Sequence, residues 1–594
     1  MPSTELPSST PADRERDRSL IAINFLPGLL AGTQIAAVLF FLNPELSFST
    51  ASFIRASLLY GGLLGVVSAL VLTLLTWRFG YRARRTLPWS VTLVLVLAAL
   101  LNWLHPAYYS YFLPSGINVR MIKAAIILTL IALACFYTAL LHTVNRRPYS
   151  LRSRVGLTLL VLASVYFVAE RRESFQPRTP PPPLPSVIEL EQRPLLLVVG
   201  LDGATLDAIL PLARQGRLPF FARLIETGAY ARLNSFPPAR PPALWTTLAT
   251  GRLPYDHGIL DDRIFPLDLL APDAYIKLLP RGIGFARWGT FGRQSRATDA
   301  TFRRSPALWE ILDRLGVLSG SVGWPMTYPV SESLVFAFSD HFFGGDFSPS
   351  NARPEDVAQR GQLFRVEPED IDASTLEAFG TRVPYSLIDA LAGDLWRESL
   401  TGFLLEQGPE VQAVFLMLPG LGIISKSHFG GYAAVQFGGT HDPERQQAAQ
   451  IVTSYYRHLD RFLAAVWQRA AEPRILAVVS PYGYEAPTGM RRLGALAAGR
   501  SLEGFSHQAP DGVLMLVGEG VRPGTFLEQA ELIDVFPSLL YALGLPIARD
   551  LDGRVLTSAF SSTFLARQPL TFVPSYDTLA IRQRDYQLPK PLES

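Results

Sequence analysis

A carboxylate at the end of an apolar strand is the first group in this chain that could do chemistry. The run Leu195–Leu201 is apolar throughout, which predicts a buried parallel strand, and Asp202 follows it directly, with Gly203 next. Open α/β sheets place their sites just beyond the carboxyl ends of central strands. Asp202 is therefore a candidate site residue. The alternative is that Asp202 only caps the following helix, as most Asp-Gly pairs do.

Short motifs follow this strand in a fixed order. They are Gly200–Asp207, Gly216–Pro219, Pro242–Gly251, His257–Ile259, Leu308–Leu312, Gly323–Pro329, Tyr456–Asp460, His507–Gly512, Asp534–Leu540 and Asp552–Gly553. In this order they resemble the type I phosphodiesterase/nucleotide pyrophosphatase group of the alkaline phosphatase superfamily, and most closely its predicted phosphohydrolase/phosphomutase branch. The resemblance implies an alkaline-phosphatase-like α/β domain with a central, mostly parallel sheet.

The resemblance also implies a chemistry. Members of this family hydrolyse phosphoesters with two divalent ions, Zn²⁺ or similar, about 4 Å apart. One ion lowers the pKa of a Thr or Ser nucleophile, and both stabilise charge on the phosphoryl oxygens. The family takes its ligands from an Asp after the first strand, the nucleophile, an Asp-x-x-x-His pair, an Asp-His pair and a late His. Each ion needs several of them.

Two of these positions are kept, because the first Asp corresponds to Asp202 and the late His to His507. The nucleophile position is different. Counted back without a gap from the shared Trp-Thr-Thr-Leu-Ala-Thr-Gly, it falls on Pro241, which has no hydroxyl. A slip of one residue gives Arg240 or Pro242, and neither is a nucleophile. The resemblance therefore predicts no catalytic residue in this chain.

The metal-ligand positions on two later strands are also lost. The Asp-x-x-x-His pair should follow the strand Val414–Pro419, and the Asp-His pair should follow the strand Ile475–Ser480. The residues at these four positions are Gly422, Lys426, Pro481 and Tyr482. One metal site thus keeps His507 alone and the other keeps Asp202 alone. A single ligand does not hold a catalytic Zn²⁺, so we expect no intact metal centre and no cofactor.

Three other histidines were weighed as ligands. His428 is either a shifted ligand or an ordinary surface histidine. The stretch Ser339–His341 looks like the missing Asp-His pair, but it precedes the Asp-x-x-x-His position and so comes in the wrong order. His441 and Asp442 lie in a polar loop and are interpreted as a turn.

The loss of two dications beside Asp202 predicts a replacement. An unpaired buried charge costs several kcal/mol, so a cationic side chain is expected to pair with this carboxylate. Arg240 and Lys426 are the two candidates, and Arg240 is preferred because its guanidinium can pair bidentately. The alternative is that backbone N–H groups of the following turn satisfy Asp202.

The first 170 residues hold the apolar surplus of a chain that is 48% hydrophobic and only 18% charged. Five runs there are long enough, or nearly so, to cross about 30 Å of hydrocarbon. They are Leu20–Leu42, Ser57–Trp77, Trp89–Leu104, Ile122–Leu141 and Val155–Ala169. The third and fifth are short, and the first contains Pro27. The sequence predicts a five-helix transmembrane domain over residues 20–169.

Arginines predict the orientation of this bundle, because basic loops are retained on the cytoplasmic side. They cluster before the first run and after the second and fourth runs, at Arg14, Arg16, Arg18, Arg78, Arg82, Arg84, Arg85, Arg146, Arg147, Arg152 and Arg154. The other loops carry only Arg55 and Arg120. An N-terminus in the cytoplasm (1–19) and five crossings place the rest of the chain outside, although Arg171 and Arg172 weaken this slightly.

The remaining organisation follows from composition. Residues 170–193 form a Pro-rich linker, which predicts an extended spacer. The α/β domain covers 194–560, and 561–594 is a C-terminal tail.

The lone Cys135 excludes an internal disulfide. Lys and Arg number 54 and Asp and Glu 51, a balance that argues against a nucleic-acid partner. The expected partners are the lipid bilayer and envelope proteins, at a bacterial-type inner membrane with the domain periplasmic or extracellular.

Two functions of different classes remain open. The leading interpretation is a pseudoenzyme, in which a membrane-anchored domain without nucleophile or metals binds or scaffolds part of an envelope assembly. The alternative is an active phosphodiesterase, phosphohydrolase or phospho-headgroup transferase, because envelope transferases share the layout of five spans and an outward phosphatase-like domain. A transporter is disfavoured, since the predicted spans carry almost no charge apart from Lys123, which lies close to a span end.

Overall fold

The structure is a computed structural model that describes residues 11–46, 48–79, 83–169, 193–267, 275–345, 347–380, 382–488, 493, 497 and 500–577. The chain divides into two compact units. Residues 1–177 with 263–297 form one, which we call the membrane unit. Residues 178–262 with 298–594 form the other, which we call the α/β unit. The predicted linker lies outside the described residues, apart from Arg193.

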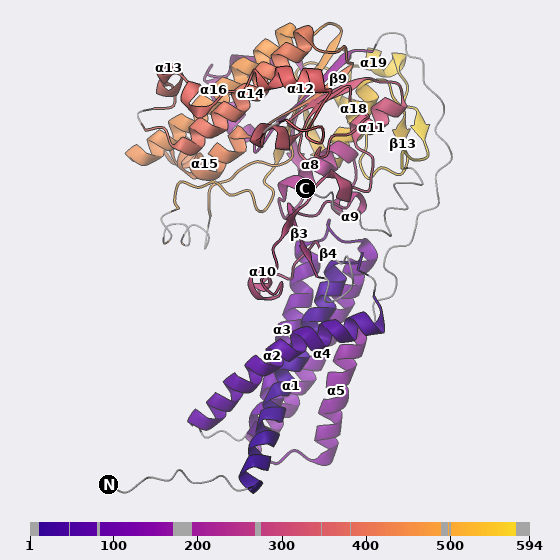
Figure 1. The fold of residues 1–594 in the computed structure, drawn as a ribbon, viewed down its shortest axis with the longest axis vertical. Helices are drawn as coiled ribbons and strands as arrows, with labels where there is room; N and C mark the ends of the chain where they lie inside the picture. Colours follow the sequence, from indigo (N-terminus) through magenta and orange to yellow (C-terminus); the bar gives the residue numbers. More distant parts are fainter. Residues whose placement is uncertain are drawn as a thin grey trace. The chain divides into compact units, whose positions relative to one another are not determined.

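Five helices make up most of the membrane unit (Figure 1), and each contains one predicted apolar run. They are α1 Pro11–Leu42, α2 Thr50–Phe79, α3 Ala83–Tyr108, α4 Ser115–Val144 and α5 Leu151–Ala169. The helix α1 continues through Pro27. Among the described residues, four spans are long and apolar enough to cross a membrane, within α1 to α4. The fifth predicted run lies in α5, a helix of 19 residues with Arg152 and Arg154 in its first turn, which is not among these four.

Small residues let α1 and α2 approach closely. A Cβ atom on Gly28 would lie 2.0 Å from the backbone oxygen of Leu64, and one on Gly32 would lie 2.2 Å from the backbone nitrogen of Gly61. Neither glycine can therefore be replaced without separating the helices. Close backbone approach through small residues is a usual way for helices to associate in lipid, where burial of apolar surface gives little driving force.

A segment from the middle of the α/β sequence belongs to the membrane unit. Residues 263–297 form a small antiparallel sheet in the order β4-β3-β5, with a short helix. Its elements are β3 Arg263–Pro266, β4 Tyr275–Ile276, α10 Phe285–Trp288 and β5 Arg296–Ala297. In one core cluster, Leu267, Ile276 and Phe285 pack against apolar side chains of α1 and α2 such as Phe40 and Tyr60.

Polar contacts fix this inserted segment to one end of the bundle. Asn43, just after α1, accepts the N–H groups of Lys277 (2.8 Å) and Leu278 (3.0 Å) and donates to the carbonyl of Leu278 at 2.8 Å. The Lys277 ammonium pairs with Glu45 at 2.8 Å, with both side chains largely buried. His105, in the last turn of α3, accepts the N–H of Arg281 through Nε2 at 2.8 Å. The sequence did not predict this docking.

A nine-stranded sheet forms the centre of the α/β unit, in the order β12-β2-β11-β10-β1-β9-β6-β7-β8. Its central strands β10, β1, β9, β6 and β7 are parallel, and β11 and β8 run antiparallel to their neighbours. The strands are β1 Leu195–Leu201, β2 Ala229–Asn234, β6 Ser319–Val322, β7 Phe336–Phe338, β8 Ala352–Arg353, β9 Ala413–Leu418, β10 Arg474–Ser480, β11 Gly512–Gly518 and β12 Thr525–Glu531. The predicted mostly parallel sheet, with its strand Leu195–Leu201, is confirmed.

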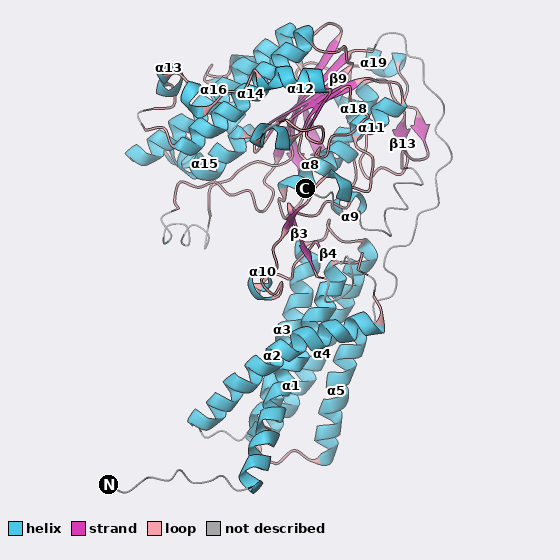
Figure 2. Cartoon of the chain, viewed as in Figure 1, coloured by secondary structure: helices cyan, strands magenta, loops and turns pink. Residues whose placement is uncertain are grey.

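Helices cover this sheet (Figure 2), with α14, α15 and α16 packed together on one side. The helices are α6 Leu206–Arg214, α7 Pro219–Thr227, α8 Pro241–Thr250, α9 Pro254–His257, α11 Leu308–Arg314, α12 Glu355–Gln362, α13 Ala373–Glu377, α14 Tyr385–Gln407, α15 Gly420–Gly438, α16 Pro443–Arg469, α18 Val535–Ala542 and α19 Ser562–Arg567. Beyond the predicted domain end at 560, α19 and β14 Phe572–Val573 continue the fold, and β14 pairs with β13 Ile547–Ala548. Ordered structure therefore extends into the predicted tail, as far as Asp577 among the described residues.

Candidate functional site

The carboxyl ends of three neighbouring parallel strands meet at one edge of the sheet. The strand β1 lies between β9 and β10, with Leu201 opposite Leu418 and Gly200 opposite Val479. This register brings Asp202, the first turn of α15 and the turn after β10 together. The positions that the resemblance assigned to metal ligands on three separate motifs are therefore neighbours in space.

Two buried aromatic side chains hold the carboxylate of Asp202. The Tyr482 hydroxyl donates to Oδ1 at 2.8 Å, and the Trp245 indole N–H donates to the same oxygen at 3.2 Å. Both donors are about 1% exposed, and Asp202 itself is half-buried between them. Among the described residues, Asp202 has no ion pair. Neutral donors thus satisfy the carboxylate at the strand end.

Burial raises the pKa of Asp202 to about 6, and the hydrogen bonds from Tyr482 and Trp245 oppose that rise. Burial and the nearby charge of Asp202 raise the pKa of Tyr482 well above its ordinary value. Tyr482 is therefore a neutral donor at any physiological pH.

The first turn of α15 packs directly on this carboxylate. A Cβ atom on Gly422 would lie 2.2 Å from Asp202 Oδ2 and 3.0 Å from its Cβ atom. Two residues earlier, a Cβ atom on Gly420 would lie 1.8 Å from the hydroxyl of Tyr455. The glycines are thus required by close approach. An Asp at position 422, as in the family pattern, does not fit this arrangement of α15.

Ser480 ties the turn after β10 to the turn after β1. Its hydroxyl donates to the carbonyl of Tyr482 at 2.8 Å and accepts the N–H of Ala204 at 3.1 Å. The N–H of Ala204 is therefore directed to Ser480 and not to Asp202. The N–H of Ala204 therefore does not satisfy the carboxylate, contrary to the alternative in which the following turn does so. The bond from Ser480 to the Tyr482 carbonyl also holds Tyr482 in place.

The predicted charge replacement of Asp202 is not what the structure shows. Arg240 pairs with Asp261. Burial raises the pKa of Asp261, and the charge of Arg240 partly opposes that rise. Lys426 is exposed, one turn beyond Gly422 along α15. The physical reason is that two neutral donors, Tyr482 and Trp245, already satisfy Oδ1 of the half-buried carboxylate.

The helix α8 begins at the predicted nucleophile position. Arg240 is its N-cap residue, without a capping hydrogen bond from its side chain, and Pro241 is the first helical residue. Proline is well suited there, because its missing N–H needs no partner in the first turn. Trp245, which contacts Asp202, lies one turn further along. The alignment that puts Pro241 at the nucleophile position is therefore consistent with the geometry.

The hydroxyls of α8 are already bound. Thr246 donates to the carbonyl of Pro242 and Thr250 to that of Thr246, each at 2.7 Å. Thr247 lies 3.1 Å from Nε2 of His257, whose Nδ1 accepts the N–H of Ile259 at 3.2 Å. Because Nδ1 is an acceptor, Nε2 carries the proton and donates to Thr247. These contacts are structural, and none of the three hydroxyls is activated by a base.

The late histidine is placed near the nucleophile position. The carbonyl of His507 accepts the N–H of Ala239 at 3.1 Å, which brings this exposed residue beside the start of α8. His341 stacks on Tyr328, with ring centroids 4.1 Å apart. Burial lowers the pKa of His428. Within the part of the chain that the structure describes, no three His, Cys, Asp or Glu side chains are grouped so that they could hold a metal ion.

Trp245 is the contact to Asp202 that sequence reasoning missed. It belongs to the motif Pro242–Gly251, but an argument from charge alone points only to cations. The resemblance makes position 482 a lost metal ligand, whereas Tyr482 donates the shorter hydrogen bond to Asp202. A signal was present, because a hydroxyl donor stands at the carboxyl end of the strand adjacent to β1.

Comparisons with known proteins identify one family and several similar structures. The sequence model of the family described as Type I phosphodiesterase / nucleotide pyrophosphatase matches residues 196–497. Human ectonucleotide pyrophosphatase / phosphodiesterase 5 is similar at 14% identity and TM-score 0.36, over 65% of this chain and 100% of its own. Wild-type alkaline phosphatase PafA is similar at 12% identity and TM-score 0.39, over 63% of this chain and 100% of its own. Phosphonate monoester hydrolase from Silicibacter pomeroyi is similar at 13% identity and TM-score 0.35, over 62% of this chain and 77% of its own. No curated protein matches.

This family match corrects the expectation of no cofactor. Members of the family are metal-dependent phosphoesterases that use zinc. The prediction that this chain has no cofactor is therefore not supported. The residues at the strand ends nevertheless do not fit the family's two-metal centre. One oxygen of Asp202 accepts from Tyr482 and Trp245, and Gly422 closes on the other.

The contacts of Asp202 predict an unusual pH dependence. Between about pH 4 and 6 the folded chain keeps the Asp202 proton, whereas the unfolded chain releases it, so the wild type loses stability as pH rises through this window. Asp202→Asn removes this titration and can keep both hydrogen bonds through its amide oxygen. Relative to the wild type, its unfolding free energy should therefore rise from pH 4 to pH 7, by up to about 3 kcal/mol.

Thermal unfolding of the full chain in detergent at several pH values measures this difference. Asp389→Asn, on the exposed surface of α14, is the matched control and should show no comparable trend. A wild type that gains stability over Asp202→Asn as pH rises would contradict the prediction, because a carboxylate that binds a cation behaves in that way.

Proposed function

The chain belongs to the type I phosphodiesterase/nucleotide pyrophosphatase family, and we propose that it is a membrane-anchored member that binds or scaffolds without hydrolysing phosphoesters. The observation that carries this proposal is the start of α8. Counted back from the shared motif, the position of the family's nucleophile falls on Pro241, which the structure places at the start of α8, one turn before the Trp245 that contacts Asp202. A proline cannot be a nucleophile.

The surroundings of Pro241 support the same conclusion. Covalent phosphoryl transfer needs a hydroxyl activated by a base or a metal. The hydroxyls of Thr246 and Thr250 donate to backbone carbonyls within the helix, and that of Thr247 is bound to His257. No side chain of α8 is thus available to take over the role of Pro241.

The strand-end site around Asp202 supports the same conclusion. In the family pattern this carboxylate is a metal ligand. Here its Oδ1 is held by Tyr482 and Trp245, and α15 packs against its Oδ2 through Gly422. We infer that this edge of the sheet now stabilises the fold, and that the α/β unit acts through binding.

The inserted segment supports an orientation for the chain. Residues 263–297 dock where the loops after α1 and α3 lie, through Asn43 and His105. Successive helices alternate in direction, so the arginine-rich loops after α2 and α4 lie at the other end. With those arginines in the cytoplasm, the end of the bundle that carries the inserted segment faces the opposite side of the membrane.

This orientation requires α5 to cross the membrane. Its 19 residues span about 28 Å as a helix, close to the hydrocarbon thickness. It packs beside α4 and α1, and Gln34 of α1 lies within 3.4 Å of Ser164. With basic loops in the cytoplasm, we propose five spans, a cytoplasmic N-terminus and an extracytoplasmic α/β unit.

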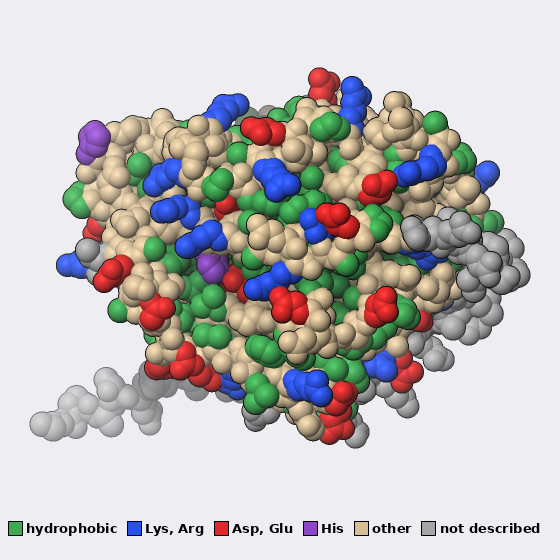
Figure 3. All heavy atoms as spheres, turned by 90° about the horizontal axis from the view of Figure 1, so that it is seen from above, with side chains coloured by type: hydrophobic (Ala, Val, Ile, Leu, Met, Phe, Trp, Pro, Cys, Tyr) green, Lys and Arg blue, Asp and Glu red, His purple; other side chains and the backbone are tan. Residues whose placement is uncertain are grey.

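The lipid bilayer and envelope proteins remain the proposed partners. Lys, Arg, Asp and Glu side chains are interspersed over the face shown in Figure 3, so this face carries no large field of one sign. Association through such a face depends on shape and on local polar pairs, which is typical of protein recognition.

The hydrolysis assay tests the proposal on the full chain in detergent with Zn²⁺ supplied. We expect no turnover of bis-p-nitrophenyl phosphate above the blank. We also expect none for Pro241→Thr, because a hydroxyl alone does not free Asp202 from Tyr482 and Trp245. Alkaline phosphatase PafA serves as the positive control. Saturable turnover by the wild type that Asp202→Ala abolishes would establish the alternative, an active phosphoesterase.

Cysteine labelling tests the orientation, because Cys135 is the only cysteine and is buried. In a Cys135→Ala background, Gln359→Cys reports the α/β unit and Asn145→Cys the arginine-rich end of the bundle. Both positions are exposed. A membrane-impermeant maleimide should label Gln359→Cys in intact spheroplasts and Asn145→Cys only after permeabilisation. Labelling of both, or of Asn145→Cys alone, before permeabilisation would refute the proposed orientation.

A further inference from the structure

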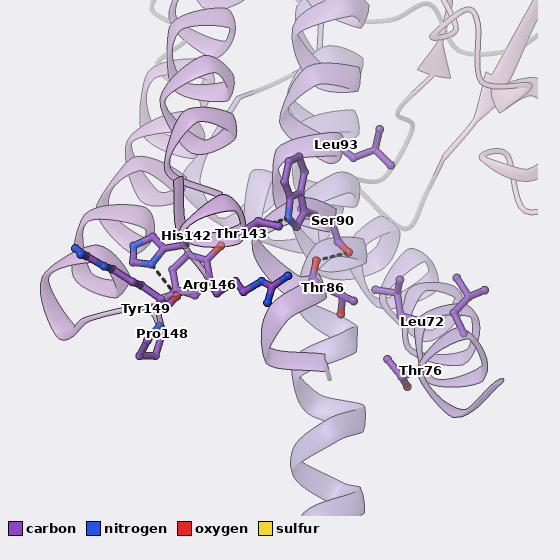
Figure 4. A pocket seen from close by; sticks show the side chains of 13 residues that line it. Leu72, Thr76, Thr86, Ser90, Leu93, His142, Thr143, Arg146, Pro148 and Tyr149 are labelled. Carbon is purple, nitrogen blue, oxygen red and sulfur yellow. Dashed lines mark hydrogen bonds between the residues drawn. The ribbon is translucent and has the colours of Figure 1, made fainter. Parts of the chain in front are cut away.

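A cavity of about 630 Å³ lies within the membrane unit at the end opposite to the inserted segment. It is bounded by the last turns of α2, the first turns of α3, and the end of α4 with the residues that follow it (Figure 4). Its volume is within the usual range for small-molecule sites. No part of the proposed function uses it.

The cavity has an apolar wall and a basic rim. Leu72 and Leu75 of α2 face Leu93 and Trp89 of α3 across it, while Arg146 lies beyond the end of α4. Leu75 is 41% exposed and Leu93 59% exposed, so the apolar wall is open toward the surroundings of the bundle. In a bilayer this opening faces lipid.

Figure 4 shows Arg146 extending from the end of α4 toward Thr86 in the first turns of α3. Arg147 follows it, and both arginines are exposed. Among the side chains that the structure describes, neither has a carboxylate partner. From residue 21 to residue 169 the sequence contains a single acidic residue, Glu45, which lies at the other end of the bundle on Lys277. The rim therefore carries positive charge that the bundle does not neutralise.

Hydrogen bonds and stacking fix the polar side of the cavity. The His142 ring stacks on Tyr149 with centroids 4.2 Å apart, and its Nε2 lies 3.0 Å from the hydroxyl of Ser153. The Trp89 indole donates to Thr143 at 3.1 Å. These contacts join α3, α4 and α5, so the rim is held in place before any ligand binds.

A simpler explanation of the two arginines is that they favour the carboxyl end of α4 and retain this loop in the cytoplasm. That explanation accounts for charge but not for an apolar cavity directly beneath it. An occupant that matches both features has an acyl chain and a negatively charged headgroup. A free anion would leave the apolar wall uncovered, and a neutral lipid would leave the arginines without a partner.

We propose that this cavity binds one anionic phospholipid of the adjacent leaflet, with its phosphate between Arg146 and Arg147 and an acyl chain along Leu72, Leu75 and Leu93. Basic pockets between transmembrane helices on the cytoplasmic side are suited to such headgroups, and each arginine contributes about fivefold in affinity. The proposal does not depend on whether the α/β unit is catalytic.

Native mass spectrometry of the full chain released from detergent micelles tests this site. The wild type should retain one phosphatidylglycerol and bind phosphatidylcholine at least about tenfold more weakly. Arg146→Gln and Arg147→Gln should each weaken phosphatidylglycerol about fivefold, and the double variant about thirtyfold. Arg152→Gln removes the same charge at this end of the bundle without lining the cavity, and it should change nothing. Leu93→Trp, which fills the apolar wall, should weaken both lipids.

Three results would overturn the proposal. Equal retention of the two lipids would overturn the role of the arginines. Competition by millimolar inorganic phosphate alone would show that the rim binds a free anion and not a lipid. An Arg152→Gln variant as weak as Arg146→Gln would reduce the effect to net charge. Circular dichroism of each variant, with the helical signal of the wild type, ensures that lost binding is not lost folding.

Discussion

The half-buried carboxylate of Asp202 is the constraint on which the α/β unit depends. A negative charge at the end of a central strand must be paired, protonated or hydrogen-bonded. In this chain Tyr482 and Trp245 donate to it, and its raised pKa reflects the burial cost that these hydrogen bonds do not offset. The turn after β10 is held by Ser480 so that Tyr482 reaches Asp202, and α15 begins with glycines so that it can pack against the same group. Three strands and two helices thus meet in a packed junction at Asp202.

Sequence reasoning predicted the features that follow from repeating physical patterns. Unbroken apolar runs identified the strands at Leu195–Leu201 and after Val414 and Ile475, and long apolar runs identified the five helices of the bundle. Motif order placed Asp202, Gly422 and Tyr482 in one site, and the register of β9, β1 and β10 brings them together. The donors to Asp202 could not be predicted in the same way. They depend on side-chain direction across segments about 40 and 280 residues apart in the chain.

The inserted segment shows the second limit of such reasoning. Nothing in the composition of residues 263–297 marks them as part of the membrane unit, since their burial depends on partners such as Phe40 and Tyr60 from a distant part of the sequence. Once docked, they connect the two units at points other than the Pro-rich linker. The buried Lys277–Glu45 pair and the hydrogen bonds of Asn43 make this a specific attachment. The bundle therefore does more than anchor the α/β unit.

The direct test of the central claim is the stability of Gly422→Ala. In a helix, alanine is favoured over glycine by up to about 1 kcal/mol, so this change should stabilise α15 if nothing lies beside it. The account predicts the opposite sign, because the added Cβ atom would meet Asp202 Oδ2 at 2.2 Å. The thermal unfolding midpoint of the full chain should fall, whereas Gly438→Ala, whose Cβ atom would meet nothing within 4 Å at the other end of α15, should leave it unchanged or raise it. A midpoint for Gly422→Ala equal to or above that of the wild type would contradict the packed junction at Asp202.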